Sequence, residues 1–264
     1  MEWWLAYAAI GAAAGFFAGL LGIGGGAVSV PLLVMLFASQ GMPKVHLVHL
    51  AVGTGMATVL FTSVSSVWAH ARRGAVRWDV ARAMTPGILA GGLVGSGLAG
   101  LVSARLLGTL FCVVIYAAAA NILFERKPRP TRQLPGAAGM SLVGFGISSV
   151  SALAALGGAF LTTPFMLWCN VRMIDAIGTA AVVGFPIALA GSIGYVASGW
   201  SQAGLPPHSL GYVYLPALLG VTLASVLFAP LGAAVAHRLQ TRQLKRVFAL
   251  LLFALATKMV TSLW

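Results

Sequence analysis

The chain alternates long apolar runs with short polar connections, and its 264 residues contain ten apolar segments. They lie at about 3–21, 27–39, 47–69, 83–102, 106–124, 136–155, 158–171, 176–199 and 210–234, with a last run ending at Trp264. Most of these runs approach the roughly 20 residues that an α-helix needs to cross a bilayer. The second and seventh runs are too short. We therefore predict an all-α polytopic membrane protein in which these two segments either cross as broken helices or re-enter.

Each short run begins at a glycine cluster. Residues 22–26 read Gly-Ile-Gly-Gly-Gly before the first, and Gly157-Gly158 precede the second. Glycine costs about 1 kcal/mol relative to alanine inside a helix, and a break in the bilayer is tolerated only against protein or a water-filled cavity. The next helix would then point its free N–H groups into that space, and such a helix start readily binds anions.

Glycines also recur every four residues in two long runs. The first ladder is Gly11, Gly15 and Gly19, and the second is Gly87, Gly91 and Gly95. Small residues at this spacing form a smooth face that favours close contact between helices in membranes. We interpret the ladders as packing faces.

The two halves of the chain repeat one plan at a spacing of about 130 residues. Thr54 and Thr179 occupy matched positions, and a basic, proline-rich stretch divides the halves. We predict a first transmembrane repeat at 1–124, a cytoplasmic linker at 125–135 and a second, inverted repeat at 136–264.

The inversion follows from the positions of the basic residues, which mark cytoplasmic loops. The connection at 70–82 is rich in arginine, whereas its counterpart at 200–208 is almost uncharged. The turn at Arg105 carries one cation, whereas its counterpart at 237–246 is strongly basic. Equivalent loops therefore have opposite bias, and both termini are predicted outside. Inverted repeats are typical of secondary transporters, which bind substrate near mid-membrane between the repeats.

Composition agrees with this class. The chain is 59% hydrophobic and 8% charged, whereas a soluble domain carries about a quarter charged residues. The net charge of +12 fits control of topology better than binding to nucleic acid. Cys112 and Cys169 lie in separate apolar runs without a CxxC pair, which indicates structural thiols. No residue pattern in the sequence indicates a cofactor or a metal site, so we predict neither.

Inversion would bring the two breaks together, so that two helix starts face one small anion. The predicted substrate-binding residues are the break glycines and nearby hydroxyls: Gly24, Gly25, Gly26, Ser29, Thr54, Gly157, Gly158, Thr162, Thr163 and Thr179. Two alternatives remain open here. The glycines could serve close packing, and the hydroxyls could bond their own helix backbone.

Three further residues are candidates for gating or coupling. Asp175 is one of four acids and follows Arg172 by three residues at a span edge. The two could form a plain ion pair or a gate, since acids at membrane depth are usually functional. His49, with His46 beside it, could titrate near neutral pH or be an ordinary surface group.

The first break and its flanks resemble the sulfite exporter TauE/SafE family of membrane transporters. The resemblance rests on residues 19–26, Gly-Leu-Leu-Gly-Ile-Gly-Gly-Gly, continuing to Pro-Leu-Leu at 31–33, and on a weaker echo at 151–164. It extends over the chain through the length, the halves and the basic linker. The resemblance implies transport of sulfur-containing anions such as sulfite or sulfonates across the bacterial inner membrane.

We therefore predict a secondary transporter that rocks one half against the other in alternating access. Its partners would be a small anion and the lipid bilayer, without nucleic acid, and a homo-oligomer is compatible with the sequence. An anion channel is an alternative, because it could use the same anion-binding helix starts. A membrane-embedded enzyme is a weaker one, because the chain has no Gly-x-Ser-x-Gly and its histidines fall at run edges.

Overall fold

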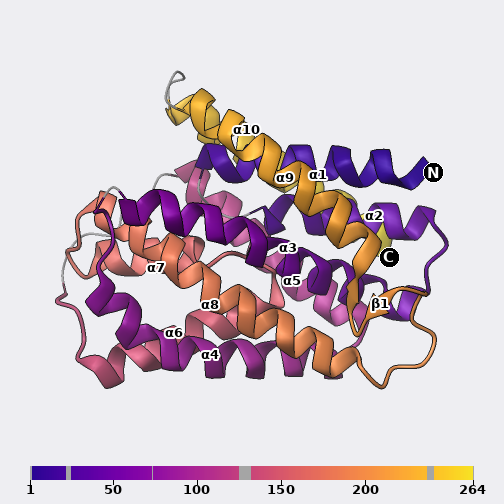
Figure 1. The fold of residues 1–264 in the computed structure, drawn as a ribbon, viewed down its shortest axis with the longest axis horizontal. Helices are drawn as coiled ribbons and strands as arrows, with labels where there is room; N and C mark the ends of the chain where they lie inside the picture. Colours follow the sequence, from indigo (N-terminus) through magenta and orange to yellow (C-terminus); the bar gives the residue numbers. More distant parts are fainter. Residues whose placement is uncertain (1, 22–24, 73, 125–131, 237–240, 264) are drawn as a thin grey trace.

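The computed structural model describes residues 2–21, 25–72, 74–124, 132–236 and 241–263. The elements are α1 (Glu2–Leu21), α2 (Gly26–Ser39), α3 (Lys44–Arg72), α4 (Trp78–Leu101), α5 (Ala104–Phe124), α6 (Ala137–Leu153), α7 (Ala159–Trp168), α8 (Met173–Gly199), β1 (Ser209–Leu210), β2 (Val213–Tyr214), α9 (Leu215–Ala236) and α10 (Thr241–Leu263). Most helices run along the long axis of the molecule (Figure 1). The predicted all-α membrane class is confirmed, with one short hairpin added.

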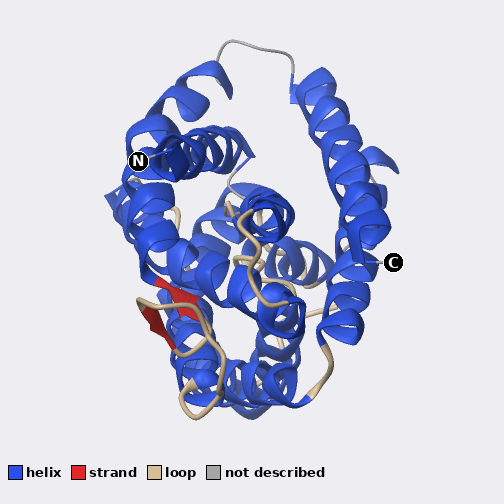
Figure 2. Cartoon of the chain, turned by 90° about the vertical axis from the view of Figure 1, so that its right-hand side faces the viewer, coloured by secondary structure: helices blue, strands red, loops and turns tan. Residues whose placement is uncertain are grey.

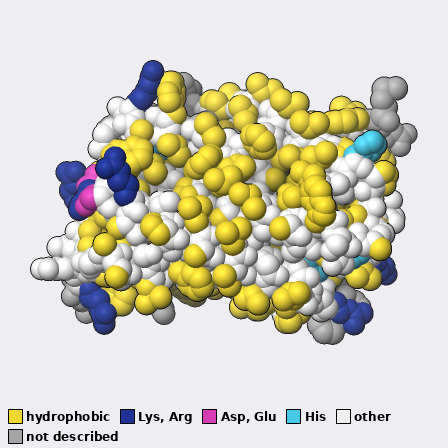
Figure 3. All heavy atoms as spheres, turned by 60° about the horizontal axis from the view of Figure 1, so that its bottom comes forward, with side chains coloured by type: hydrophobic (Ala, Val, Ile, Leu, Met, Phe, Trp, Pro, Cys, Tyr) yellow, Lys and Arg dark blue, Asp and Glu magenta, His cyan; other side chains and the backbone are white. Residues whose placement is uncertain are grey.

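Among the described residues, α3, α4, α5, α8 and α9 are long and apolar enough to cross a membrane. Helices α1, α2, α6 and α7 contribute shorter apolar stretches. Figure 3 shows a broad hydrophobic band on the visible face, with charged side chains gathered at its two ends. The chain is therefore a multi-pass membrane protein.

We name the two ends of the molecule by what they hold. The hairpin end carries the β1–β2 hairpin, the first residues of α1 and the last of α10 (Figure 1). Figure 2 looks onto this end, with the helices seen largely along their axes. The linker end is the opposite one, where α4, α6 and α8 begin.

Helix α1 packs against α9 along the first glycine ladder. Gly11, Gly15 and Gly19 face backbone carbonyls of α9 so closely that an added methyl group would overlap the oxygen. The hydroxyl of Ser225 on α9 donates to the Gly11 carbonyl at 2.9 Å. The ladder is thus a packing face, as its spacing predicted.

Helix α4 packs against α6 in the same way (Figure 1). The glycines of the second ladder, Gly87, Gly91 and Gly95, face carbonyls of α6 without room for a side chain. The hydroxyl of Ser149 on α6 donates to the Gly91 carbonyl at 3.0 Å. In both pairs the ladder glycines come from the first half of the chain and face carbonyls of the second, and in the α4–α6 pair Gly144 of α6 also faces the Met84 carbonyl of α4.

Helices α3 and α8 pack together at the centre of the molecule (Figure 1). Each helix accepts a hydrogen bond from a backbone N–H that immediately precedes a helix of the other half. The Thr54 hydroxyl of α3 accepts the backbone N–H of Tyr214 at 2.9 Å. The Thr179 hydroxyl of α8 accepts the backbone N–H of Arg77, also at 2.9 Å.

Four helix starts differ from the sequence-based prediction by three residues or more. Helix α4 begins at Trp78 and α8 at Met173, five and three residues before the expected starts, and the other two differences concern α3 and α9. Helix α3 begins at Lys44, so His46 and His49 lie in its first two turns instead of in a connection. Pro43 immediately precedes this start, and proline favours the first positions of a helix, where no N–H is needed. The basic and imidazole side chains therefore project from a helix end.

The fourth difference is the hairpin before α9. A helix was expected from about residue 210, but Ser209 pairs with Tyr214 and Leu210 with Val213 in two antiparallel strands. Gly211 takes a left-handed backbone conformation, with φ of 56°, which glycine adopts without a steric penalty. The turn therefore delays the helix to Leu215.

Candidate functional site

Both short helices begin with the same local geometry. Gly25 is the N-cap of α2 and Gly158 is the N-cap of α7. The Gly25 carbonyl accepts the N–H of Ser29, and the Gly158 carbonyl accepts the N–H of Thr162, each at 2.9 Å. The first N–H groups of each helix have no partner within that helix. Residues 22–24, including the predicted site residue Gly24, lie outside the described residues.

The two breaks are in direct contact. Gly26, the first residue of α2, lies against the backbone carbonyl of Ala155 in the α6–α7 connection, with Val59 of α3 beside it. Ala155 has a left-handed φ of 44°, which costs an L-residue about 1–2 kcal/mol. From this contact, α2 extends toward the hairpin end and α7 toward the linker end (Figure 1).

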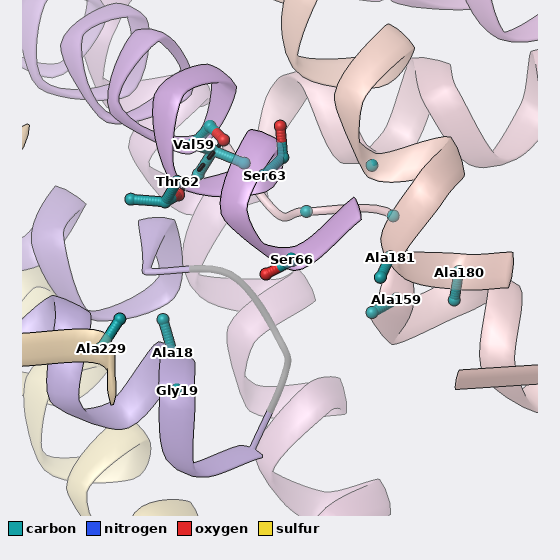
Figure 4. Close-up of a pocket in the computed structure, with 13 residues that line it drawn as sticks. Ala18, Gly19, Val59, Thr62, Ser63, Ser66, Ala159, Ala180, Ala181 and Ala229 are labelled. Carbon is teal, nitrogen blue, oxygen red and sulfur yellow. Dashed lines mark hydrogen bonds between the residues drawn. The ribbon is translucent and has the colours of Figure 1, made fainter. Parts of the chain in front are cut away.

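A cavity of about 60 Å³ lies beside the second break. It is lined by Gly157, Gly158 and Ala159 around the start of α7, and by Ala18, Gly19, Val59, Thr62, Ser63, Ser66, Ala180, Ala181, Gly184 and Ala229. Figure 4 shows these small side chains converging from separate helices of both halves. The volume holds about four water molecules, which is the size of a small oxyanion.

Among the described residues, the cavity wall offers hydrogen-bond donors and no charged side chain. The donors are the backbone N–H groups of Gly158 and Ala159 at the start of α7 and three hydroxyls of α3. Thr62 now donates to the Val59 carbonyl at 3.2 Å, and Ser63 to the Leu60 carbonyl at 2.8 Å. Because a hydroxyl rotates freely, these groups can redirect a proton toward an anion.

Thr62, Ser63 and Ser66 were not predicted from the sequence. Their spacing of one and four residues places them near one helical face, and three hydroxyls so close together in an apolar run are the signal that could have found them. Only the fold shows that this face of α3 meets the second break.

The predicted residues of the second half fall into two groups. Gly157 and Gly158 line the cavity. Thr162, one turn into α7, is fully buried and its hydroxyl has no hydrogen-bond partner. Thr163 is half-buried. A buried hydroxyl without a hydrogen-bond partner costs free energy. A ligand bound at the break, or a movement of α7, could supply the missing partner of Thr162.

The predicted residues of the first break are more tightly packed. Gly25 lies against Ala14 of α1, with room for little more than a methyl group. Ser29 is fully buried, and its hydroxyl reaches the Gly26 carbonyl at 3.5 Å. These two residues and Gly26 are absent from the lining of the cavity.

Thr54 and Thr179 are also fully buried and away from the cavity lining. Both hydroxyls accept the backbone N–H groups described above, and that of Thr179 also donates to the Asp175 carbonyl at 2.7 Å. Their matched positions therefore join the two halves of the chain.

The three candidates for gating lie at opposite ends of the molecule. At the linker end, Arg172 and Asp175 form an ion pair of 2.7 Å, with Asp175 buried and Arg172 exposed. The hydrogen bond to the Asp175 carboxylate raises the pKa of the Arg172 guanidinium. At the hairpin end, His49 is buried between the end of α4 and Tyr212.

Neither cysteine belongs to a metal or redox cluster within the described residues, where no three His, Cys, Asp or Glu side chains come together. Cys112 and Cys169 are free and buried. Burial raises the pKa of the Cys169 thiol, which follows the last residue of α7.

Comparison with known proteins identifies the family. The family model described as sulfite exporter TauE/SafE matches residues 7–259. A probable membrane transporter protein of Haemophilus influenzae is 34% identical over 251 residues, covering 95% of both chains. A relative of the same description from Methanocaldococcus jannaschii is 24% identical over 244 residues, covering 89% of this chain and 87% of the relative. No solved structure matches the chain. The chain therefore belongs to the sulfite exporter TauE/SafE family and is a membrane transporter of that type.

Proposed function

We propose that this transporter is a secondary carrier for a small sulfur-containing anion, such as sulfite or a sulfonate, in the bacterial inner membrane. The observation that carries the proposal is the small cavity at the α6–α7 break, which lies between helices of both halves. It combines backbone N–H groups at a helix start with nearby hydroxyls, and none of its described lining residues carries a negative charge. The family description supplies the sulfur chemistry.

Exchanged contacts support the inverted arrangement of the halves. Gly53 of α3 packs against the Tyr212 carbonyl, just before α9. Gly178 of α8 packs against the Ala75 carbonyl, just before α4. The two threonine hydrogen bonds run the same way, from one half to the other. A two-fold axis relating the halves would generate this pattern.

The repeats would then be residues 1–124 and 136–264, joined by a cytoplasmic linker at 125–135. The linker end holds most of the described cations, which supports a cytoplasmic location for it under the positive-inside rule. Both termini would then lie outside.

The moving units should differ from the two sequence halves. We expected one half to rock against the other, but the glycine ladders fix α1 to α9 and α4 to α6. If either pair separated, the glycines would lose their contact with the partner backbone and leave a gap, because glycine has no side chain to fill it. We therefore propose that α1 moves with α9 and α4 with α6, and that movement of the α1–α9 pair, which lines the cavity through Ala18, Gly19 and Ala229, opens or closes that side of it.

The test is flux of radiolabelled sulfite in proteoliposomes with Gly184→Ala. A methyl group at Gly184 would meet only the Gly158 backbone nitrogen, at 3.7 Å. The fold should tolerate it, but the methyl group occupies part of a four-water cavity and shields the N–H. We expect flux to fall about tenfold, equivalent to about 1.4 kcal/mol. Gly146→Ala is the matched control, because a methyl group there meets no other atom within 4 Å.

Wild-type flux from Gly184→Ala, with normal insertion, would rule out the cavity as the site. Countertransport separates the carrier from a channel: an excess of unlabelled sulfite inside the vesicles should accelerate entry of labelled sulfite. A channel would show no such acceleration. Competition by methanesulfonate, sulfate and acetate would define the substrate class.

A further inference from the structure

A groove of about 630 Å³ lies between α3, α4 and α8 on the outside of the molecule. Its walls are mostly apolar and include Val64 and Val67 of α3, Leu89 of α4, and Phe185 and Leu189 of α8. Val64 and Leu89 are exposed, so this surface faces lipid in a bilayer. Among the described residues, the groove and the cavity at the break share no lining residue.

One face of α4 runs along the groove and changes from polar to apolar. Trp78, Arg82, Thr85 and Leu89 all line the groove, and residues three or four apart lie on the same side of a helix. The Thr85 hydroxyl donates to the Ala81 carbonyl at 2.8 Å, so its hydrogen-bonding need is met within α4. The charge is therefore confined to Arg82, near the start of the helix.

The length of this face matches one leaflet of a bilayer. Trp78 is the first residue of α4, at the linker end. Leu89 follows eleven residues later, which is about 17 Å along a helix. The hydrocarbon core of a bilayer is roughly 30 Å thick, so the groove reaches from the membrane surface to about its middle. Tryptophan favours the interface, which puts Trp78 and Arg82 at the level of the lipid headgroups.

Arg82 offers a positive charge that no carboxylate neutralises. Its side chain is exposed, and it forms no ion pair within the described part of the chain. The nearest acid in the sequence, Asp79, instead accepts two hydrogen bonds from Arg77, at 2.6 and 2.9 Å. The groove therefore combines an apolar channel as long as a leaflet with one free cation at headgroup level.

We propose that this groove binds one anionic phospholipid from the leaflet at the linker end. The headgroup phosphate contacts the Arg82 guanidinium, whose N–H groups can bind it as a pair, and one acyl chain lies along α4 against α3 and α8. Basic pockets between membrane helices on the cytoplasmic side are typical sites for anionic lipids. The proposal concerns lipid binding at equilibrium, so it is independent of the transport function assigned to the cavity.

The test is native mass spectrometry of the full-length protein, delipidated in detergent and titrated with dioleoyl phosphatidylglycerol. Dioleoyl phosphatidylethanolamine is the reference, because it has the same chains and no net charge. We expect the first phosphatidylglycerol to bind at least roughly fivefold more tightly than the reference lipid, the effect of one charge pair at contact distance in water. Inorganic phosphate at equal concentration should not displace it, because phosphate lacks the acyl chain.

Two pairs of variants separate the headgroup contact from the apolar one. Arg82→Gln should reduce the affinity for phosphatidylglycerol to that of the reference lipid, and Arg82→Lys should retain the preference. Lys258→Gln, at an exposed position of α10, removes the same charge and should have no effect. Val64→Trp should weaken both lipids by filling the groove. Leu98→Trp should weaken neither, because Leu98 is equally exposed but lies outside the groove lining.

Several results would overturn the proposal. Equal wild-type affinity for the two lipids would exclude the anionic headgroup, as would an equal loss in Arg82→Gln and Lys258→Gln. Displacement by inorganic phosphate would mean an anion site that does not use the groove. A protein dimer that binds no lipid would mean that a second copy of the chain covers this face. The first comparison uses wild-type protein, so it is decisive even if a variant does not fold.

Gly184→Ala distinguishes this site from the transport cavity. It should bind phosphatidylglycerol like the wild-type protein while losing flux. Normal lipid binding with normal flux would reject the cavity alone, and loss of the lipid preference in Arg82→Gln with normal flux would leave both proposals standing.

Discussion

Replacing Thr54 or Thr179 by valine should weaken the joint between the halves at two equivalent points. Valine keeps the branched shape but removes the oxygen that accepts the N–H of Tyr214 or Arg77, each now bonded at 2.9 Å. Both threonines are fully buried, so water has poor access to the orphaned donor. A buried donor without a partner costs about 1–3 kcal/mol. We expect similar losses at the two positions.

Hydrogen exchange is the appropriate assay, because unfolding of large proteins is often irreversible and reports a rate instead of an equilibrium. A local loss of 1–3 kcal/mol corresponds to roughly 5- to 150-fold faster exchange of the affected amide. Mass spectrometry on peptides from the protein in nanodiscs should show this at Tyr214 in Thr54→Val. The same change should appear at Arg77 in Thr179→Val.

Threonine-to-serine variants are the controls, since serine keeps the accepting oxygen and loses only a methyl group. Exchange at Tyr214 that is no faster in Thr54→Val than in Thr54→Ser would refute the hydrogen bond as the source of protection. A large effect at one position and none at the other would contradict the two-fold equivalence of these contacts.

Two further predictions address topology and packing. Reporter fusions after residues 76 and 204 should report opposite sides of the membrane, and the same side for both would refute the inversion. Gly91→Ala should destabilise the protein by about 1–3 kcal/mol through overpacking, because its methyl group would overlap the Phe145 carbonyl. Gly97→Ala on the same helix meets no other atom within 4 Å and should be tolerated; equal thermal stability of the two variants would contradict the packing argument.

Features set by local sequence were predictable. The length of each apolar run fixes whether a helix can cross the bilayer, and glycine spacing fixes which face of α1 and α4 is smooth. The partner of each smooth face was not predictable. Helices α9 and α6 offer carbonyls of their main chain, and every helix has those. The boundary of α3 was also missed, because polar residues such as Lys44 and His46 are as common in loops as at helix starts.

The candidate site was predicted in part. Gly157 and Gly158 stood out because paired glycines are poor helix formers, and they border the cavity. Thr54 and Thr179 stood out by their matched positions, yet the sequence could not show that backbone N–H groups already occupy their oxygens. The α3 hydroxyls Thr62 and Ser63 were overlooked because their role depends on a neighbour about 95 residues later.

The pairing of α1 with α9 has a consequence for biogenesis. The hydrogen bond between Ser225 and Gly11 spans 214 residues, so the glycine face of α1 has no partner until nearly the whole chain has been synthesised. The α4–α6 pair, with a bond spanning 58 residues, can form much earlier. The nascent chain should therefore build the α4–α6 pair first and keep α1 in lipid or against the insertion machinery until α9 emerges from the ribosome.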